Sequence, residues 1–161
     1  MKRILFLAFT TFLLITLSAC GGKKGTSDDL LVGTWVASEP TTVTESGMTI
    51  TFSDMTSTYS KDNTAKASGN MSMSGAGLPV KLDMTIATES TWSIEGNTLS
   101  ETITDADIKM KTNIPGMPDM GGIMAQQMKS QAGTSTIVKL DKKTLILKED
   151  KTSIQVTMKR K

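Results

Sequence analysis

The sequence of 161 residues contains no histidine and only one cysteine, Cys20. The absence of histidine excludes Ser-His-Asp and Cys-His catalysis, and it excludes every zinc site that needs an imidazole ligand. A single cysteine cannot form a disulfide within the chain, so packing and backbone pairing must stabilise the fold. These absences favour a protein that is not an enzyme and that needs no cofactor.

Aromatic side chains and net charge are scarce as well. Only 4% of the residues are aromatic, and three of the four phenylalanines lie within the first 19 residues. The core must therefore be built mainly from Val, Ile, Leu and Met. The formal net charge of +2 falls to zero when Lys2 and Arg3 are set aside, so the rest of the chain has no basic excess with which to bind nucleic acid.

The N-terminal segment has the composition of an export signal. The two basic residues precede an uncharged run from Ile4 to Leu17, which is too short for a comfortable membrane span. The run ends in Leu17-Ser18-Ala19-Cys20, which resembles the lipobox of bacterial lipoproteins. This resemblance implies cleavage before Cys20 and acylation of that cysteine. Residues 1–19 are therefore expected to be a signal peptide, and Cys20 a lipid anchor in a bacterial envelope membrane.

Residues 20–29 contain several glycines and no large apolar side chain, so they are expected to form a flexible tether. Gly21 rather than Asp follows Cys20, which resembles the enterobacterial sorting pattern for the outer membrane. The domain that follows, residues 30–161, is thereby expected at the outer membrane, held by its N-terminal lipid.

The domain shows the period of two that is typical of half-buried β-strands. Between Val80 and Glu95, six of the eight even positions are apolar, whereas one of the eight odd positions is. The run predicts an unusually long strand with a bend or bulge near Thr88 to Ser90, where the apolar face is interrupted. Shorter runs place on one face Met48, Ile50 and Phe52; Ala65, Ala67, Gly69, Met71 and Met73; Thr136, Val138 and Leu140; Leu145 and Leu147; and Ile154, Val156 and Met158.

Four short polar stretches between these runs have the residue types of tight turns. They are Lys61-Asp62-Asn63, Glu95-Gly96-Asn97, Asp141-Lys142-Lys143 and Glu149-Asp150-Lys151. The pattern predicts an all-β domain, an antiparallel up-and-down meander of about eight strands that closes into a barrel or folds as a sandwich. Its outward positions are rich in threonine, which suits a sheet face in water rather than in lipid.

An insertion at about 105–133 interrupts the strand pattern. Pro118 can begin a short helix that ends at Gly133, and four methionines then share one face of it. They are Met117, Met120, Met124 and Met128. Gly121 and Gly122 each weaken such a helix by about 1 kcal/mol relative to Ala, so a mobile lid or loop is expected.

Gly33-Thr34-Trp35 at the start of the β-rich domain resembles the Gly-x-Trp opening of the lipocalins and of the small lipocalin-like domains of bacterial lipoproteins. The resemblance implies a closed or nearly closed barrel of the calycin type. In that family the early tryptophan plugs the closed end, and a basic residue of the last strand lies over its ring. Trp35 and Arg160 are expected to form this pair, with a cation–π attraction of about 1 kcal/mol.

The same resemblance implies a binding protein, a cup for a small apolar or amphipathic ligand in the envelope. The candidate cavity residues lie on the inward positions of the alternating runs. They are Met71, Met73, Met84, Thr88, Ser90 and Trp92. Thr88 and Ser90 are the polar groups expected to orient a ligand, unless both mark a bulge in a filled interior.

Two other functions stay open. A non-enzymatic scaffold or protein-interaction module with an envelope protein partner would present an exposed apolar face, for which Met117 to Met128 is the candidate. Alternatively, Met117, Met120, Met124 and Met128 can bind Cu(I) or Ag(I), because soft sulfur ligands select soft ions, with Met71 and Met73 as partners. Packing by flexible methionines explains the same pattern without a metal.

Overall fold

The computed structural model describes residues 24–75, 78, 80–111 and 120–161. The expected signal peptide, Cys20 and Met117 lie outside these residues. The described strands are β1 (Gly33–Ala37), β2 (Thr41–Glu45), β3 (Met48–Tyr59), β4 (Thr64–Gly75), β5 (Leu82–Glu95), β6 (Thr98–Met110), β7 (Ala132–Leu140), β8 (Thr144–Glu149) and β9 (Gln155–Arg160). The described helices are α1 (Lys24–Leu31) and α2 (Met120–Met128), and neither is long and apolar enough to cross a membrane.

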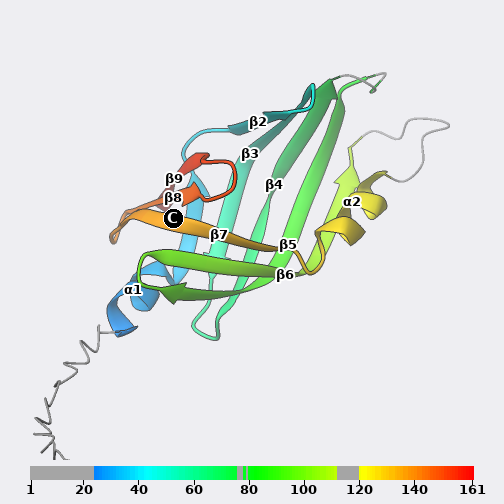
Figure 1. Ribbon diagram of the computed structural model, residues 1–161. Coiled ribbons are helices and arrows are strands. Elements are labelled where there is room, and N and C mark those ends of the chain that lie inside the picture. The colour runs from blue at the N-terminus through cyan, green and yellow to red at the C-terminus, as the bar shows by residue number, and fades with distance from the viewer. Residues whose placement is uncertain (1–23, 76–77, 79, 112–119) are drawn as a thin grey trace, which may run out of the picture.

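Eight of these strands form one closed antiparallel barrel (Figure 1). Neighbour pairing runs in chain order from β3 to β9, then from β9 to β1, and β1 pairs with β3 to close the circle. Among the described strands, β2 is the extra one, and it extends the edge of β3 beyond the end of β1. The prediction of an all-β antiparallel meander of about eight strands in a closed barrel is therefore confirmed.

β5 shows how the alternation of the sequence builds the barrel wall. Its even-numbered side chains, from Leu82 to Ile94, are buried or half-buried, and every odd-numbered one is exposed. The apolar face therefore lines the interior, and its burial contributes roughly 25 cal/mol per Å² to folding. An irregularity is present near Thr88 to Ser90 as predicted, but the extra residue, Thr104, belongs to the partner strand β6.

A second bulge lies in β3. The register with β4 shifts between Ser53 and Thr56, and Asp54 adopts a left-handed conformation with φ of +55°. Within the bulge, Met55 lies so close to Gly69 that a Cβ at Gly69 would be 2.3 Å from the Met55 sulfur. Gly69 is therefore the residue that lets the methionine enter the interior.

A third bulge, in β7, corrects the predicted inward set of that strand. Val138 is the extra residue there, so it points outward and is 54% exposed. Ile137 and Leu140 pack against the core instead. The prediction that Thr136, Val138 and Leu140 share the inward face is therefore wrong for Thr136 and Val138, which are exposed. The inserted residue at Val138 changes the alternation, so Ile137 before it and Leu140 after it both face inward.

The interior holds two apolar clusters. The closed-end cluster has as its buried members Leu31, Trp35, Tyr59, Ala65, Trp92, Ile94, Leu99, Leu145, Leu147 and Met158. The methionine cluster has as its buried members Met71, Met73, Leu82, Met84, Ile86, Ala106, Ile108 and Ala125. β7 pairs with β6 only over Thr98–Thr102, and α2 packs against β6. The molecule thus has a closed half, which contains the closed-end cluster, and a half-sheet, in which the far ends of β3 to β6 extend beyond β7 and α2 packs against β6 (Figure 1).

α1 occupies a segment that the sequence predicts to be the end of a flexible tether, so this prediction is wrong from residue 24 onward. Leu31, at the end of the helix, is fully buried in the closed-end cluster. The carbonyl oxygens of Leu30 and Val32 accept hydrogen bonds from Arg160, and that of Leu31 accepts one from Trp35. Carbonyls at a helix C-terminus lack hydrogen-bond donors within the helix, and here Trp35 and Arg160 are the donors. Because these two residues are on other elements, the composition of residues 24–31 does not predict the helix.

The predicted insertion from about 105 is shorter in the structure. β6 continues to Met110, and the period of two persists because Ala106 and Ile108 are buried while their neighbours are exposed. α2 ends at Met128 rather than at Gly133, since β7 already begins at Ala132. An ion pair of 2.8 Å between Lys129 Nζ and Asp105 Oδ1 joins the end of α2 to β6.

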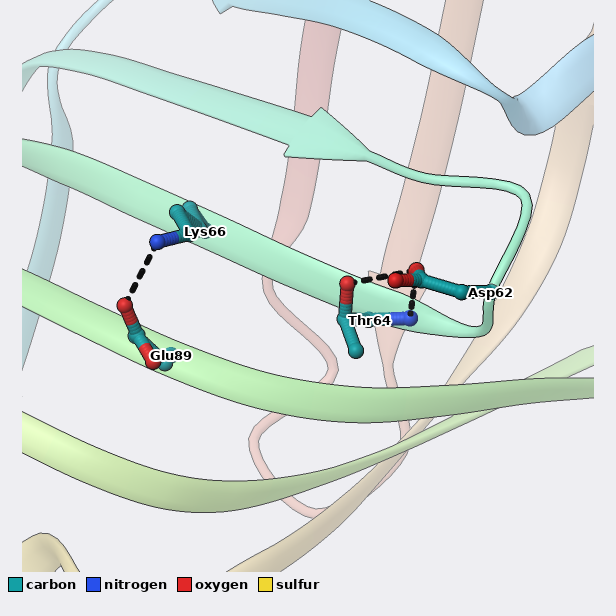
Figure 2. A network of polar contacts seen from close by, with 4 residues as sticks. All are labelled: Asp62, Thr64, Lys66 and Glu89. Atoms are coloured by element: carbon teal, nitrogen blue, oxygen red, sulfur yellow. Dashed lines mark hydrogen bonds and ion pairs between the residues drawn. The ribbon is translucent and has the colours of Figure 1, made fainter.

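The four predicted turns each connect two neighbouring strands, as expected. In the turn from β3 to β4, Asp62 Oδ1 accepts hydrogen bonds from the backbone N–H of Thr64 (3.1 Å) and from its hydroxyl (2.6 Å; Figure 2). Nearby on the outer face, Lys66 Nζ lies 2.7 Å from Glu89 Oε1. The polar contacts in Figure 2 therefore belong to the surface of the barrel and to its turn.

Candidate functional site

Trp35 and Arg160 close one end of the barrel. Trp35 is fully buried, and its indole Nε1 donates a hydrogen bond to Leu31 O at 2.7 Å. The guanidinium carbon of Arg160 lies 4.3 Å from the centre of a Trp35 ring, and Arg160 Nη1 donates to Val32 O at 2.9 Å. The contact expected between these two side chains is present, and it also attaches α1 to the last strand.

Gly33 makes this closure possible. Its φ is +138°, which side chains rarely adopt, and a Cβ there would lie 2.2 Å from Arg160 Nη1. The glycine of the Gly-x-Trp motif is thus explained by the space that the guanidinium needs. This end of the barrel is filled, so a ligand site must lie elsewhere.

A cavity of about 440 Å³ lies between the closed-end cluster and the methionine cluster. It exists because small side chains face one another on adjacent strands. Ser57 pairs with Ala67, which pairs with Thr88, and Ala65 pairs with Ser90. These five side chains line the cavity, and none of them is large enough to reach across the interior.

Two of the six predicted cavity residues, Thr88 and Ser90, line this space. Met71, Met73 and Met84 are instead buried members of the methionine cluster, with exposed fractions of 3%, 6% and 0%. Their long side chains pack with Ala125 of α2, so they fill their part of the interior.

Trp92 belongs to the closed-end cluster and is not among the residues that line the cavity. Its indole donates to Thr64 O at 3.0 Å, and its ring meets that of Tyr59 edge to face at 6.0 Å. Placing Met71, Met73, Met84 and Trp92 in the cavity is therefore wrong, because the open space occurs only where the inward side chains are small.

The cavity also contains a polar pair that the sequence pattern did not single out, Tyr59 and Glu101. Burial, then the charge of Glu101 and a hydrogen bond with it, raise the pKa of the Tyr59 hydroxyl well above its usual value. Burial likewise raises the pKa of Glu101, and the hydrogen bond with Tyr59 partly opposes this. The inward position of Glu101 could be predicted from the sequence, because it follows the inward residue Leu99 by two positions on β6.

The mouth of the cavity is formed where the strands of the closed half end. Glu149 ends β8, Lys151 follows it in the turn to β9, and Gln131 precedes β7; all three line the opening. Gly133 on β7 pairs with Glu101, and a Cβ built on it would meet no atom within 4 Å. Gly133 is exposed, so the open space in front of it lies at the solvent side of the cavity that it lines.

α2 turns its methionine face toward the protein. Met124 and Met128 are half-buried and pack against the methionine cluster, which includes Met71 and Met73. Met120 is half-buried at the start of the helix. Among the described residues, no three carboxylates converge where a metal ion could bind.

The fold and the cavity together define the class of protein: an antiparallel β-barrel with one filled end and an internal space bounded by a carboxylate and hydroxyl groups. No protein-family model and no curated protein matches the chain. The chemistry of the cavity must therefore be read from its own residues.

Proposed function

We propose that this protein is a lipid-anchored bacterial envelope lipoprotein, without enzymatic activity, whose barrel holds a small amphipathic ligand. The observation that carries the proposal is the cavity between the two clusters. Its volume of about 440 Å³ falls within the range of 300–1,000 Å³ usual for small-molecule sites. Apolar groups such as Ala65 and Ile103 alternate around it with hydroxyl groups such as Thr88 and Ser90.

The polar lining favours an amphipathic ligand over a purely apolar one. Buried hydroxyl and carboxyl groups lose hydrogen bonds to water, and an alkyl chain cannot replace them. A ligand with a polar head and a compact apolar body satisfies both kinds of lining. The hydroxyls of Ser57 on β3 and of Thr88 and Ser90 on β5 lie on the two strands that flank β4, so they can fix the orientation of that head.

The proposed anchor agrees with the position of α1. Leu31 of α1 belongs to the closed-end cluster, whereas Ala125 of α2 belongs to the methionine cluster. A lipid on Cys20, which precedes α1 by a few residues, would therefore hold the filled end of the barrel toward the outer membrane. The half-sheet and α2 would then point away from the bilayer.

Native mass spectrometry of the protein purified from its own cells tests the binding proposal. We expect a bound small molecule in the wild-type protein and its absence in a Gly133→Val variant, because the valine side chain enters the empty space in front of Gly133. Ala87→Val is the matched control, since Ala87 is exposed on the outer face of β5. A wild-type protein without any bound molecule, or Gly133→Val with full occupancy, would contradict the proposal.

A second candidate function is Cu(I) or Ag(I) binding, which one observation favours. Eight methionines gather in and around the methionine cluster: Met48, Met55, Met71, Met73, Met84, Met110, Met124 and Met128. If they bind Cu(I), replacing Met124 and Met128 with Leu lowers copper retention against a competing chelator, whereas Met158→Leu in the closed-end cluster does not. Equal retention in all three proteins assigns these methionines to packing.

A scaffold function has less support. It requires an exposed apolar face on α2, but Met124 and Met128 pack inward. The large apolar side chains that the described residues do expose, Val80, Ile123 and Val138, come from three separate segments. We therefore retain ligand binding as the leading proposal.

A further inference from the structure

Glu101 is a largely buried carboxylate that has no cationic partner among the described residues. The five ion pairs of the described chain all join exposed side chains, and none includes Glu101. Its hydrogen-bonding neighbour is the Tyr59 hydroxyl, which is neutral. A carboxylate removed from water and left without a counter-charge is costly, so its place in a cavity calls for a positively charged partner.

The other charged groups around the cavity do not supply that charge. Lys66 contributes to the lining, but its ammonium group pairs with Glu89 on the outer face. Lys151 stands at the mouth, where the nearby Glu149 carboxylate offsets it. The inner end therefore presents one negative charge, which attracts cations and repels the carboxylates or phosphates of anionic ligands.

The geometry also leaves room for a group next to Glu101. On β6 this residue lies between Trp92 of β5 and Gly133 of β7. Trp92 and Tyr59 are ring neighbours on one side, while the space in front of Gly133 is empty on the other. A ligand head that enters past Gly133 meets the carboxylate, and the cavity wall of Ala65, Ala67 and Ile103 is left for an apolar body.

We propose that the cavity selects small amines: a protonated amino group binds the Glu101 carboxylate, and a compact apolar body packs against the alanine-rich wall. This inference rests on the proposed ligand-binding function and adds the chemical class of the ligand. The Tyr59 hydroxyl holds the carboxylate in position as a hydrogen-bond donor. Burial raises the pKa of Glu101 because it disfavours the charged form, and a bound cation would offset that cost.

Three shape-matched probes test the selectivity: 2-phenylethylamine, 2-phenylethanol and 3-phenylpropanoate. Their affinities are measured by calorimetry on the full chain in lipid nanodiscs, with empty nanodiscs as the reference. We expect the amine to bind at least about tenfold more tightly than the carboxylate, as a charge-assisted hydrogen bond allows. Glu101→Gln should lower amine affinity by about tenfold and leave the alcohol unchanged. Glu95→Gln, at the exposed end of β5, is the matched control.

The outcomes separate this inference from the proposed function. If the carboxylate binds as tightly as the amine to the wild-type protein, the amine inference is overturned, and this comparison does not depend on any variant. Amine selectivity that persists in a folded Glu101→Gln protein overturns it as well. In both cases, alcohol binding that Gly133→Val abolishes still supports the cavity as a binding site. If none of the three probes binds, the amine inference is overturned, and the proposed function is decided by the native mass spectrometry of the wild-type and Gly133→Val proteins.

Discussion

Arg160 combines three contacts that a lysine cannot make together. Its guanidinium covers the Trp35 ring and donates to the carbonyls of Leu30 and Val32. We expect Arg160→Lys to lower the free energy of unfolding by about 2 kcal/mol, because one ammonium group cannot serve both carbonyls and the ring. Urea unfolding followed by tryptophan fluorescence measures the change. Lys159→Arg, on the same strand but exposed, is the control, and equal stability of all proteins would show that the closure is not energetically important.

Glu101 gives the stability of the protein a pH dependence. Burial raises its folded-state pKa above the ordinary value near 4.5, so the folded chain holds this proton more tightly than the unfolded chain does. The resulting stabilisation is complete below about pH 4.5 and is lost as the pH rises through the folded-state pKa. At a pH above its folded-state pKa, Glu101 is therefore a buried charge that the unfolded chain exposes to water.

We accordingly expect Glu101→Gln to be more stable than the wild-type protein at pH 7, because glutamine keeps an acceptor for Tyr59 without the buried charge. The advantage should shrink as the pH falls toward 4.5, where the wild-type carboxyl group is protonated. Urea midpoints of the two proteins at several pH values measure this difference. An advantage that stays constant with pH, or appears equally in Glu95→Gln, would contradict the assigned role of Glu101.

The sequence predicts single residues well where a motif defines them. Gly33, Trp35 and Arg160 take the positions that the lipocalin-like opening and the last strand imply. Glu101 was missed because a charged residue in an alternating run is normally assigned to the outer face. Its inward position follows only when the run is aligned with Leu99 and Ile103 on either side of it.

α2 lies outside the closed ring of strands and packs against β6 and the methionine cluster. We expect Ala125→Asp to release it, because Ala125 is 8% exposed and a buried, unpaired carboxylate is costly. Hydrogen exchange should show loss of protection over residues 120–128, while β1 and β8 remain protected. Gln126→Asp, exposed on the same helix, is the control. Unfolding of the whole barrel in Ala125→Asp would contradict the independence of this element.

At the level of elements, the prediction succeeds where periodicity is uninterrupted and fails where one residue changes it. β4, β5 and β8 have the inward residues that alternation predicts. Val138 shows the limit, because a bulge depends on the pairing of two strands and leaves no mark in one of them. α1 was missed for a related reason: the groups that hold its last carbonyls, Trp35 and Arg160, are contributed by β1 and β9.

The whole molecule divides into a filled end, a central cavity and a methionine-packed half-sheet. The strand count and the turns predicted a meander that could close into a barrel or fold as a sandwich, and the resemblance of Gly33-Thr34-Trp35 to the lipocalin opening favoured the closed barrel. The position of the cavity could not, because it depends on small residues from different strands meeting in register. Ser57, Ala67 and Thr88 are unremarkable in sequence and become a cavity wall only when β3, β4 and β5 are aligned.

A crystal structure of the protein purified from its own cells, without added ligand, tests the central claim most directly. Ligand binding in the central cavity predicts continuous electron density for a small molecule between Tyr59, Thr88, Ser90 and Glu101, with its polar end at the carboxylate. A cavity that contains only ordered water, or an interior in which neighbouring side chains have closed the space, would contradict it.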